Sequence, residues 1–595
     1  MPTSLFSSDF RAILNAAALT RPGAQASPFP SPIDWRDQWI YFLMVDRFNS
    51  SKPPLHLPFD DPNYFAFQGG KFSGIRTQLH YIKQLGAGSI WISPALKNLK
   101  FDQGTYHGYG IHDFLRAEPR FADNPDKADD ELRQLVDAAH NEGLFVIFDI
   151  VLNHTGDVFA YANGSESFHP DPQPVFWRDA NGVAQAQFTD VATIPNPSLD
   201  AVVWPKELQQ NRFFRRQGNP GSADDTVGDF ASLKQMMTGD PELQRFLIRA
   251  YQYVIARYDV DGFRIDTLRY LKGGLPQLFG NAVREFALSI GKKNFFTFGE
   301  VLDSSEETDI ARFIGRNTSD QTDMVGVDAA LDYPLFTNLK PMVKGFAPPS
   351  SVVAMYHLRK SIEQDILSSH GDATRFFVTF LDNHDMKERI RYEDPQDPTK
   401  YDDQVTLGLA CLFSLPGIPC VYYGTEQGLH GHGTDPAVRE ALWGGPGFNQ
   451  DSKFFGAIKQ IAQVRATQAA LRYGRFYFRP VSGDGHGFAV SNFTPGVLAF
   501  SRILNDEEVL VAANASTSQT IDLDVIVEIQ LSSDGDRFQV LYSNQATPIL
   551  PQPVRTRGPG TVNVQEVDGS SGTGPLHVVH VTLRPLEVQI LRNAG

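Results

Sequence analysis

Residues 240–266 read DPELQRFLIRAYQYVIARYDVDGFRID and combine the signals of one helix with those of one strand. Asp240 is a typical helix N-cap, Pro241 suits the first helical turn, and Glu242 places an acid near the helix N-terminus. Apolar residues then recur at helical spacing, and the short apolar run Gly262–Ile265 follows, as expected of a buried strand. This segment predicts a helix that packs against a strand of a sheet.

The same alternation of strand-like runs and helical stretches extends along most of the chain. Strand-like apolar runs occur at Trp39–Val45, Ser89–Ile92, Leu144–Ile150, Gly262–Ile265, Phe295–Phe298, Met324–Val327, Phe376–Phe380 and Ile418–Tyr423. Eight strands with helical crossovers are typical of a closed α/β barrel, the (β/α)8 or TIM barrel. We therefore predict that residues 33–154 and 229–478 form this barrel.

Three segments lie outside the alternating pattern. Residues 155–228 are rich in Pro, Asn and Phe and too long for an ordinary loop, which predicts an inserted domain after the third strand. Residues 479–595 contain short alternating runs, with Asn505-Asp506 as a hairpin turn, and predict a C-terminal antiparallel β-sandwich. Residues 1–32 are expected to form an N-terminal leader.

The composition is that of a globular protein with an acidic surface. The chain has 53 Lys and Arg residues against 69 Asp and Glu residues, a formal net charge of −16. Such a surface repels phosphate backbones and anionic lipids, so no nucleic-acid or membrane partner is expected. The sequence leaves the oligomeric state open.

Two further features bear on location. The N-terminus lacks the basic start and continuous apolar run of a secretory signal, so a cytoplasmic location is expected. The uncharged stretch Val405–Tyr423 is interrupted by Pro416, Gly417 and Pro419, and this pattern predicts a helix, a turn and a strand rather than a membrane span.

Polar residues follow several of the predicted strands, at the end of a barrel where reacting groups usually lie. These residues are Asp149, Asn153 and His154 after the third run, Arg264 and Asp266 in the fourth, Glu300 after the fifth, and Asn383, His384 and Asp385 after the seventh. A single carboxylate in such a position is more often a helix cap or a loop acceptor. Four strand ends in barrel order instead predict one common pocket.

Paired carboxylates in one pocket indicate glycoside chemistry, in which one attacks the anomeric carbon and the other protonates the leaving oxygen. Arg264 lies two residues before Asp266, on the same face of the strand, and can hold that carboxylate ionised. Asp266 is therefore the predicted nucleophile and Glu300 the predicted acid/base. Asp385 is a third carboxylate, suited to substrate hydroxyls and to developing positive charge.

Four segments resemble the signature segments of the α-amylase family, a large group of retaining glycoside hydrolases active on α-glucans. They are DIVLNH (149–154), GFRID (262–266), GE (299–300) and DNHD (382–385), supported by SIWISP at Ser89, YHGYG at Tyr106 and GIPCVYYGTEQ at Gly417. The resemblance implies that residues 155–228 are the family's domain B and that the end of the chain is its domain C.

The resemblance also implies roles for individual residues. It makes Asp266 the nucleophile, Glu300 the acid/base and Asp385 the stabiliser of the transition state. The residues expected to bind substrate are Tyr109, Asp149, His154, Arg264, Arg269 and His384, with Tyr109 stacked on the sugar. Many members have a small residue after Asp266, then a Lys and a His, whereas this chain reads TLRY at 267–270.

Calcium ligands of the family are only partly present in this chain. Asn153 matches a usual ligand and Asp229 lies near another, but Ala231 and Ser232 follow where a ligand acid is usual. In a second loop the lysine of Gly69-Gly70-Lys71 replaces an acid, and its ammonium could occupy the cation's place. We expect that no cofactor is required and that calcium is not essential.

The sequence predicts an α-amylase-like enzyme that hydrolyses α-glucans or malto-oligosaccharides by double displacement. One alternative is a transglycosylase with the same site, such as a glucanotransferase or a sucrose- or trehalose-active enzyme. An alternative of another class is a non-catalytic carbohydrate-binding scaffold, which the complete set of carboxylates disfavours.

Overall fold

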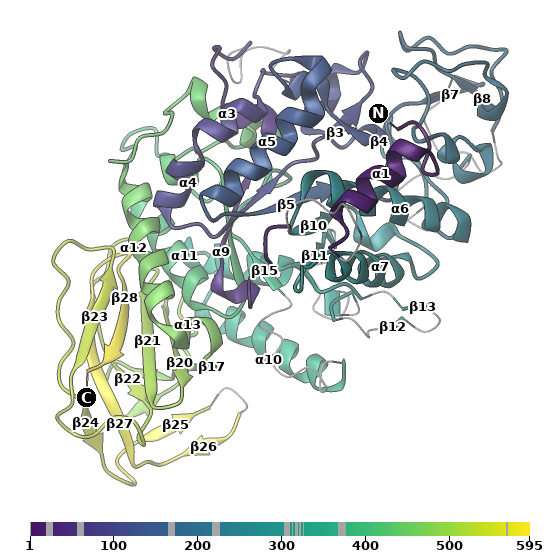
Figure 1. The fold of residues 1–595 in the computed structure, drawn as a ribbon. Coiled ribbons are helices and arrows are strands. Elements are labelled where there is room, and N and C mark those ends of the chain that lie inside the picture. The colour runs from purple at the N-terminus through teal and green to yellow at the C-terminus, as the bar shows by residue number, and fades with distance from the viewer. Residues whose placement is uncertain are drawn as a thin grey trace.

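Eight parallel strands close into a barrel at the centre of the computed structural model (Figure 1). The structure describes residues 2–19, 28–55, 65–164, 173–216, 227–302, 310–311, 313–315, 319–320, 323–324, 326–366, 377–566 and 569–594. In spatial order the barrel strands are β1 (Ile40–Leu43), β16 (Ile418–Tyr422), β15 (Phe377–Thr379), β14 (Ala329–Leu331), β11 (Phe296–Gly299), β10 (Gly262–Ile265), β5 (Phe145–Ile150) and β2 (Ser89–Ile92). The predicted (β/α)8 barrel is confirmed.

The predicted position of one of the eight strands was wrong. The expected run Met324–Val327 is not the sixth barrel strand, because β14 lies further on at Ala329–Leu331. Asp323–Met324 instead forms strand β13, which pairs with β12 (Ser319–Asp320) outside the barrel. The two alanines of β14 have a low strand propensity, so tertiary pairing rather than local pattern defines this strand.

Helices surround the barrel strands (Figure 1). They are α2 (Val45–Phe48), α3 (Phe72–Thr77), α4 (Leu79–Leu85), α5 (Ala128–Asn141), α6 (Pro241–Tyr258), α7 (Leu275–Ser289), α9 (Tyr333–Val343), α10 (Pro349–Ile366), α11 (Asp402–Ser414), α12 (Lys453–Thr467) and α13 (Ala469–Tyr473). Helix α6 begins as predicted, since the Asp240 side chain accepts hydrogen bonds from the backbone N–H groups of Glu242 and Leu243. The stretch Val405–Tyr423 is divided between α11 and β16, as predicted.

An insertion separates β5 from α6. It contains β6 (His154–Thr155), β7 (Phe159–Tyr161), β8 (Val175–Trp177) and β9 (Lys234–Gln235), in which β6 pairs with β9 and β7 with β8. The insertion therefore leaves and re-enters the barrel through one two-stranded sheet, and it returns a few residues after the predicted end at residue 228. A second, shorter pair, β3 (Leu96–Asn98) and β4 (Ile111–Ala117), follows β2.

The C-terminal region is built from β sheets, at the lower left of Figure 1. One sheet contains β17 (Arg475–Phe478), β20 (Val497–Leu504), β21 (Glu507–Asn514), β28 (Val588–Asn593) and β23 (Phe538–Ser543); a second contains β18 (Val481–Ser482), β22 (Ile521–Val527), β27 (Leu576–Leu583) and β24 (Arg555–Arg557). A small third sheet contains β19 (Gly487–Phe488), β25 (Asn563–Gln565) and β26 (Ser571–Gly572). Strand β17 already belongs to this region, so the region begins slightly before the predicted boundary at residue 479.

The predicted hairpin turn is present in the first of these sheets. Leu504 pairs with Glu507 across Asn505-Asp506, and Asn505 has the positive φ that a tight hairpin turn demands. Apolar side chains from the first two sheets, including Leu510, Val525 and Leu591, form a separate buried cluster. These features support the predicted C-terminal sandwich.

The predicted N-terminal leader is in part a packed element. Residues Ser8–Ala17 form helix α1, which lies against α6. Phe10 is fully buried and stacks on Tyr253 with a ring-centroid distance of 4.9 Å. Two features of the sequence indicate this helix, the capping residue Ser7 and the helical spacing of the apolar residues. The sequence prediction had used this segment only to exclude a secretory signal.

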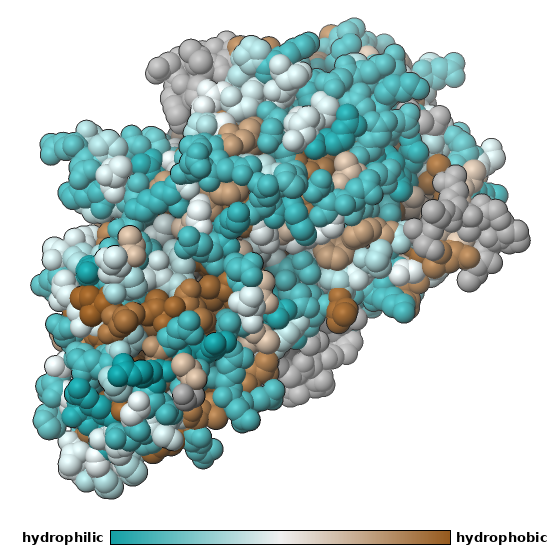
Figure 2. All heavy atoms as spheres, turned by 60° about the vertical axis from the view of Figure 1, so that its left-hand side comes forward, coloured by the Kyte–Doolittle hydropathy of each residue, from teal (hydrophilic) through white to brown (hydrophobic). Residues whose placement is uncertain are grey.

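The face visible in Figure 2 is mostly hydrophilic, with a large hydrophobic patch at the left of the view and smaller ones elsewhere. No helix within the described ranges combines the length and the apolar character that crossing a bilayer demands. Cys411 and Cys420 are both buried and unpaired.

The packing of α1 makes a prediction about stability. Phe10→Ala should lower the free energy of unfolding by about 3–5 kcal/mol, because it empties a fully buried aromatic site. Phe6→Ala is the matched control, since the Phe6 side chain is 49% exposed and should cost little. Denaturant titration measures both values, and a Phe10→Ala variant as stable as wild type would show that the packing of Phe10 does not stabilise the fold.

Candidate active site

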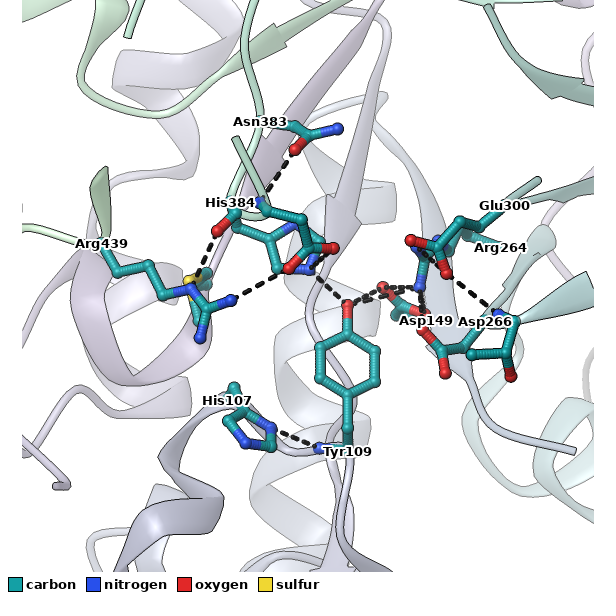
Figure 3. A network of polar contacts seen from close by, with 12 residues as sticks. His107, Tyr109, Asp149, Arg264, Asp266, Glu300, Asn383, His384 and Arg439 are labelled. Carbon is teal, nitrogen blue, oxygen red and sulfur yellow. Dashed lines mark hydrogen bonds and ion pairs between the residues drawn. The ribbon is translucent and has the colours of Figure 1, made fainter. Parts of the chain in front are cut away.

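Polar strand-end residues predicted from the sequence, among them Asp149, Arg264, Asp266, Glu300 and His384, lie in one network of contacts (Figure 3). Strand β10 lies between β5 and β11, and in this register Arg264 pairs with Asp149 on one side and with Phe298 on the other. Asp266 and Glu300 follow directly on these strands. Barrel pairing therefore brings together groups that are far apart in the chain.

The fully buried guanidinium of Arg264 is the centre of this group. Its Nη1 donates to Asp149 Oδ1 at 2.9 Å and to Asp266 Oδ1 at 2.8 Å, while Nη2 forms an ion pair with Glu300 Oε2 at 3.1 Å. The backbone N–H of Thr267 also donates to Glu300 Oε2 at 3.0 Å. One cation thus contacts three buried carboxylates and fixes their relative positions.

These carboxylates differ in proton affinity. Burial raises the pKa of Asp266 to about 6 against the lowering effect of Arg264, and burial raises the pKa of Glu300 to about 8. The pKa of Asp149 is raised to about 7, also by burial, although Arg264 and Tyr109 oppose the shift. At neutral pH this order leaves Asp266 mostly ionised and Glu300 mostly protonated.

Asp385 lies across the pocket from this cluster and has a different environment. Its Oδ2 is 3.1 Å from His384 Nε2, and its Oδ1 accepts a hydrogen bond from Arg439 Nη2 at 2.9 Å. Burial alone would raise the pKa of Asp385, but His384, Arg439 and Arg264 outweigh burial and lower it below its ordinary value. Asp385 therefore stays ionised at neutral pH.

Neutral histidines complete the pocket wall. Burial lowers the pKa of His154 to about 4 and those of His384 and His107 to about 3. The Nε2 of His154 lies 4.0 Å from Asp266 Oδ2. Uncharged imidazoles in these positions can donate hydrogen bonds to a neutral ligand without an added charge.

Tyr109 connects the two halves of the pocket (Figure 3). Its hydroxyl donates to Asp149 Oδ2 at 2.8 Å and lies 2.8 Å from His384 Nε2, and its ring stacks on that imidazole at 5.7 Å. Arg269 is part of a short helix (Leu268–Tyr270) that begins two residues after Asp266, and its Nη1 donates to the carbonyl of Leu302 at 3.4 Å.

Arg439 is the main site residue that the sequence analysis missed. Besides contacting Asp385, its Nε donates to the carbonyl of His384 at 2.9 Å and its Nη1 to the Tyr106 hydroxyl at 3.1 Å. Arg439 lies in the loop after β16 and not directly at a strand end. A search for polar residues that close the predicted strands therefore does not find it. The available signal was a basic residue in a loop at the carboxyl end of the barrel.

The candidate metal ligands are engaged by donors of the protein. Asn153 Oδ1 accepts from Gln235 Nε2 at 3.3 Å, and Asp229 accepts from the Tyr161 hydroxyl at 2.7 Å and from the N–H of Gln235 at 2.8 Å. The Lys71 ammonium donates to the carbonyls of Arg120 and Ala122 at 2.7 and 3.0 Å. Among the described residues, no group of three or more His, Cys, Asp or Glu side chains could hold a metal ion.

Comparison with known sequences identifies one family. The profile described as "Alpha amylase, catalytic domain" matches residues 42–472. The chain is 27% identical to an α-amylase of Streptomyces lividans, with 82% of this chain and 55% of that protein covered. It is 28% identical to a β/α-amylase of Paenibacillus polymyxa, with 89% and 37% covered, and 25% identical to a cyclomaltodextrin glucanotransferase of Klebsiella oxytoca, with 84% and 73% covered. The chain thus spans about half or less of the first two relatives.

Solved structures share the fold. An α-amylase from Geobacillus thermoleovorans, complexed with acarbose, superimposes with a TM-score of 0.64 at 23% identity over 95% of this chain and 100% of that one. A γ-cyclomaltodextrin glucanotransferase from an alkalophilic Bacillus clarkii gives 0.66 at 21% identity, over 94% and 71%. At 21–23% identity this structural similarity shows a shared fold and nothing about activity.

The Arg264 cluster makes a prediction about stability and pH. Arg264→Met should lower the free energy of unfolding at neutral pH by about 3–5 kcal/mol, because it leaves buried carboxylates without their counter-ion. Their folded-state pKa values then rise further above the unfolded values, so the folded protein binds more protons than the unfolded chain over a wider pH range. The difference in free energy of unfolding between Arg264→Met and wild type should therefore become smaller as the pH falls from about 8 to about 5.

Denaturant titrations at several pH values measure this deficit. Arg555→Met, at an exposed position in the C-terminal region, is the control and should show no such trend. A deficit that does not change with pH would show that Arg264 acts through packing and not through charge.

Proposed function

The chain belongs to the α-amylase family, and from this premise we propose that it is a retaining glycoside hydrolase that cleaves α-glucosidic bonds in α-glucans or malto-oligosaccharides. The observation that supports this activity most directly is the pair Asp266 and Glu300, held by one guanidinium yet separated in pKa, about 6 against about 8. A nucleophile must be ionised and a general acid must be protonated at the same pH.

The proposed reaction has two steps. In the first, an Asp266 oxygen attacks the anomeric carbon, the bond to the glycosidic oxygen breaks, and Glu300 transfers its proton to that oxygen. In the second, the Glu300 carboxylate accepts a proton from water, whose oxygen attacks the anomeric carbon and releases Asp266. Two inversions give net retention of configuration.

The other pocket residues act on the same sugar in this proposal. Asp385, whose pKa is lowered and whose Oδ1 binds Arg439, stabilises the positive charge that develops at the anomeric carbon. Asp149, His154, His384 and Tyr109 bind hydroxyl groups, and Tyr109 also presents its ring. Arg264 holds the nucleophile, whereas Arg269 donates to the carbonyl of Leu302, two residues after Glu300.

Transglycosylation on the same site is the second candidate function. A cyclomaltodextrin glucanotransferase is among the relatives, and the covalent intermediate can be transferred to a sugar hydroxyl as well as to water. Incubation with maltoheptaose, starch, sucrose or trehalose, followed by sizing of the products, separates the two. Shorter products alone support hydrolysis, whereas cyclic products or products longer than the substrate support transfer.

The roles assigned to the two carboxylates predict different activities for two variants. Glu300→Gln should lower turnover of malto-oligosaccharides by several orders of magnitude, yet it should still release fluoride from α-glucosyl fluoride, whose leaving group needs no proton. Asp266→Asn should lose both reactions, because no nucleophile remains. Near-normal hydrolysis of maltoheptaose by either folded variant would refute the assignment.

The pKa values predict the pH profile of kcat/KM. Activity should fall below about pH 6 as Asp266 gains a proton, and above about pH 8 as Glu300 loses one. Arg439→Met should lower the rate by about 10²-fold, because Asp385 loses the guanidinium that binds its Oδ1 and lowers its pKa. Arg439→Lys keeps a charge and should lower the rate less. The acid limb should stay near pH 6 in both variants, because Asp266 sets it. A rate of Arg439→Met close to that of wild type, or equal losses in Arg439→Met and Arg439→Lys, would refute an electrostatic role of Arg439.

A further inference from the structure

A fully buried lysine lies at the base of the insertion that separates β5 from α6. Lys234 is part of β9, and its side chain is 0% exposed. Its Nζ lies 3.3 Å from Asp157 Oδ1 and 3.7 Å from Asp229 Oδ2. A buried ammonium is costly unless it is compensated, and here at least two carboxylates compensate it.

Aromatic rings complete the enclosure of this charge. The Nζ of Lys234 lies 5.3 Å from the ring centroid of Phe159 and 5.2 Å from that of Tyr161, both on β7. Ring faces attract cations, and this attraction is strongest where water is excluded. The Lys234 ammonium therefore contacts three segments of the insertion: strand β7, the turn after β6 through Asp157, and the segment before β9 through Asp229.

Both carboxylates have further contacts that fix them around the ammonium. Arg178 Nη2 lies 2.9 Å from the second oxygen of Asp157. Asp229 accepts from the Tyr161 hydroxyl at 2.7 Å and from the backbone N–H of Gln235 at 2.8 Å. The oxygens are thus oriented toward N–H, O–H and ammonium donors of the chain.

These residues do not fit a bound calcium ion. Calcium needs about six to eight oxygen ligands at about 2.3–2.6 Å, including carboxylates that are free to coordinate. Here Asp229 and Asn153 accept hydrogen bonds from the chain, and the Lys234 ammonium lies within ion-pair distance of Asp229. A divalent cation at this place would be repelled by that ammonium.

Strand pairing also connects the lysine to the candidate active site. Lys234 pairs with Thr155, and Gln235 pairs with His154, in the two-stranded sheet that joins the insertion to the barrel. The Nε2 of His154 faces Asp266 at 4.0 Å. Any change that loosens β9 would therefore move the histidine beside the predicted nucleophile.

We propose that the Lys234 ammonium is a built-in cation that holds the base of the insertion together in the place of a bound divalent ion. The insertion consequently folds, and His154 is positioned, without a metal. In a different loop the Lys71 ammonium donates to two backbone carbonyls. This proposal concerns stability and does not depend on which reaction the site performs.

Thermal melting of the full chain tests the proposal. Wild-type protein should show the same Tm in metal-free buffer, with excess EDTA and with added calcium chloride. Lys234→Met should lower the Tm by roughly 5 °C under all three conditions, because the buried carboxylates lose a counter-ion. Lys453→Met is the matched control, since Lys453 forms an ion pair with Asp403 while half exposed and should leave the Tm unchanged.

Two further variants identify the charge as the cause. Lys234→Met/Asp229→Asn should recover part of the lost Tm, because it removes a carboxylate together with its cation. Lys234→Arg retains the charge and should fold and melt closer to wild type than Lys234→Met; if Lys234→Met yields no folded protein, folding of Lys234→Arg still supports the proposal.

Two outcomes would overturn the proposal. One is a wild-type Tm that falls by several degrees with EDTA and returns with calcium. The other is a Lys234→Met variant as stable as Lys453→Met. Neither readout uses catalytic activity, so a failure here is distinguishable from a failure of the proposed hydrolase function.

Discussion

One buried guanidinium, that of Arg264, determines the arrangement of the candidate active site. It contacts Asp149, Asp266 and Glu300 from three adjacent barrel strands, so the three carboxylates can be buried together only because this cation lies between them. The barrel register supplies the required positions. Gly299 adds a steric condition, because a Cβ there would approach the Leu268 side chain to 2.2 Å, and the N–H of Leu268 donates to the carbonyl of Glu300 at 3.0 Å.

A second arginine makes the two sides of the pocket electrostatically different. Around Arg264, three carboxylates compete for one cation, and burial raises their pKa values. Arg439 contacts the carboxylate of Asp385, whose pKa is lowered. At neutral pH Glu300 is therefore mostly protonated, Asp266 mostly ionised and Asp385 ionised, which are the protonation states that double displacement requires. The fourth acid, Asp149, has a pKa of about 7 and is close to half-protonated.

Much of this arrangement could be predicted from the sequence, because strand-end motifs carry both the fold and the chemistry. Apolar runs defined seven of the eight barrel strands, and the residues that closed them include Asp149, Arg264, Asp266, Glu300 and Asp385. The sixth strand was misplaced because its alanines carry little local signal and pairing with β11 and β15 decides its position. Arg439 and Lys234 were not found, since neither follows a barrel strand directly and their contacts with Asp385 and Asp157 join residues that are distant in sequence. Helix α1 was overlooked although Ser7 caps it, because tertiary packing of Phe10 on Tyr253 gives the segment its role.

The central claim is that Asp266 forms a covalent bond to the sugar. Reaction with 5-fluoro-α-D-glucosyl fluoride, which slows release of the intermediate, can be followed by mass spectrometry of the intact protein and of its peptides. The account predicts a mass increase of one fluoroglucosyl unit, located on the peptide that contains Asp266 and on that residue. An adduct on Glu300 or Asp385, or turnover with inverted products and no adduct, would contradict it.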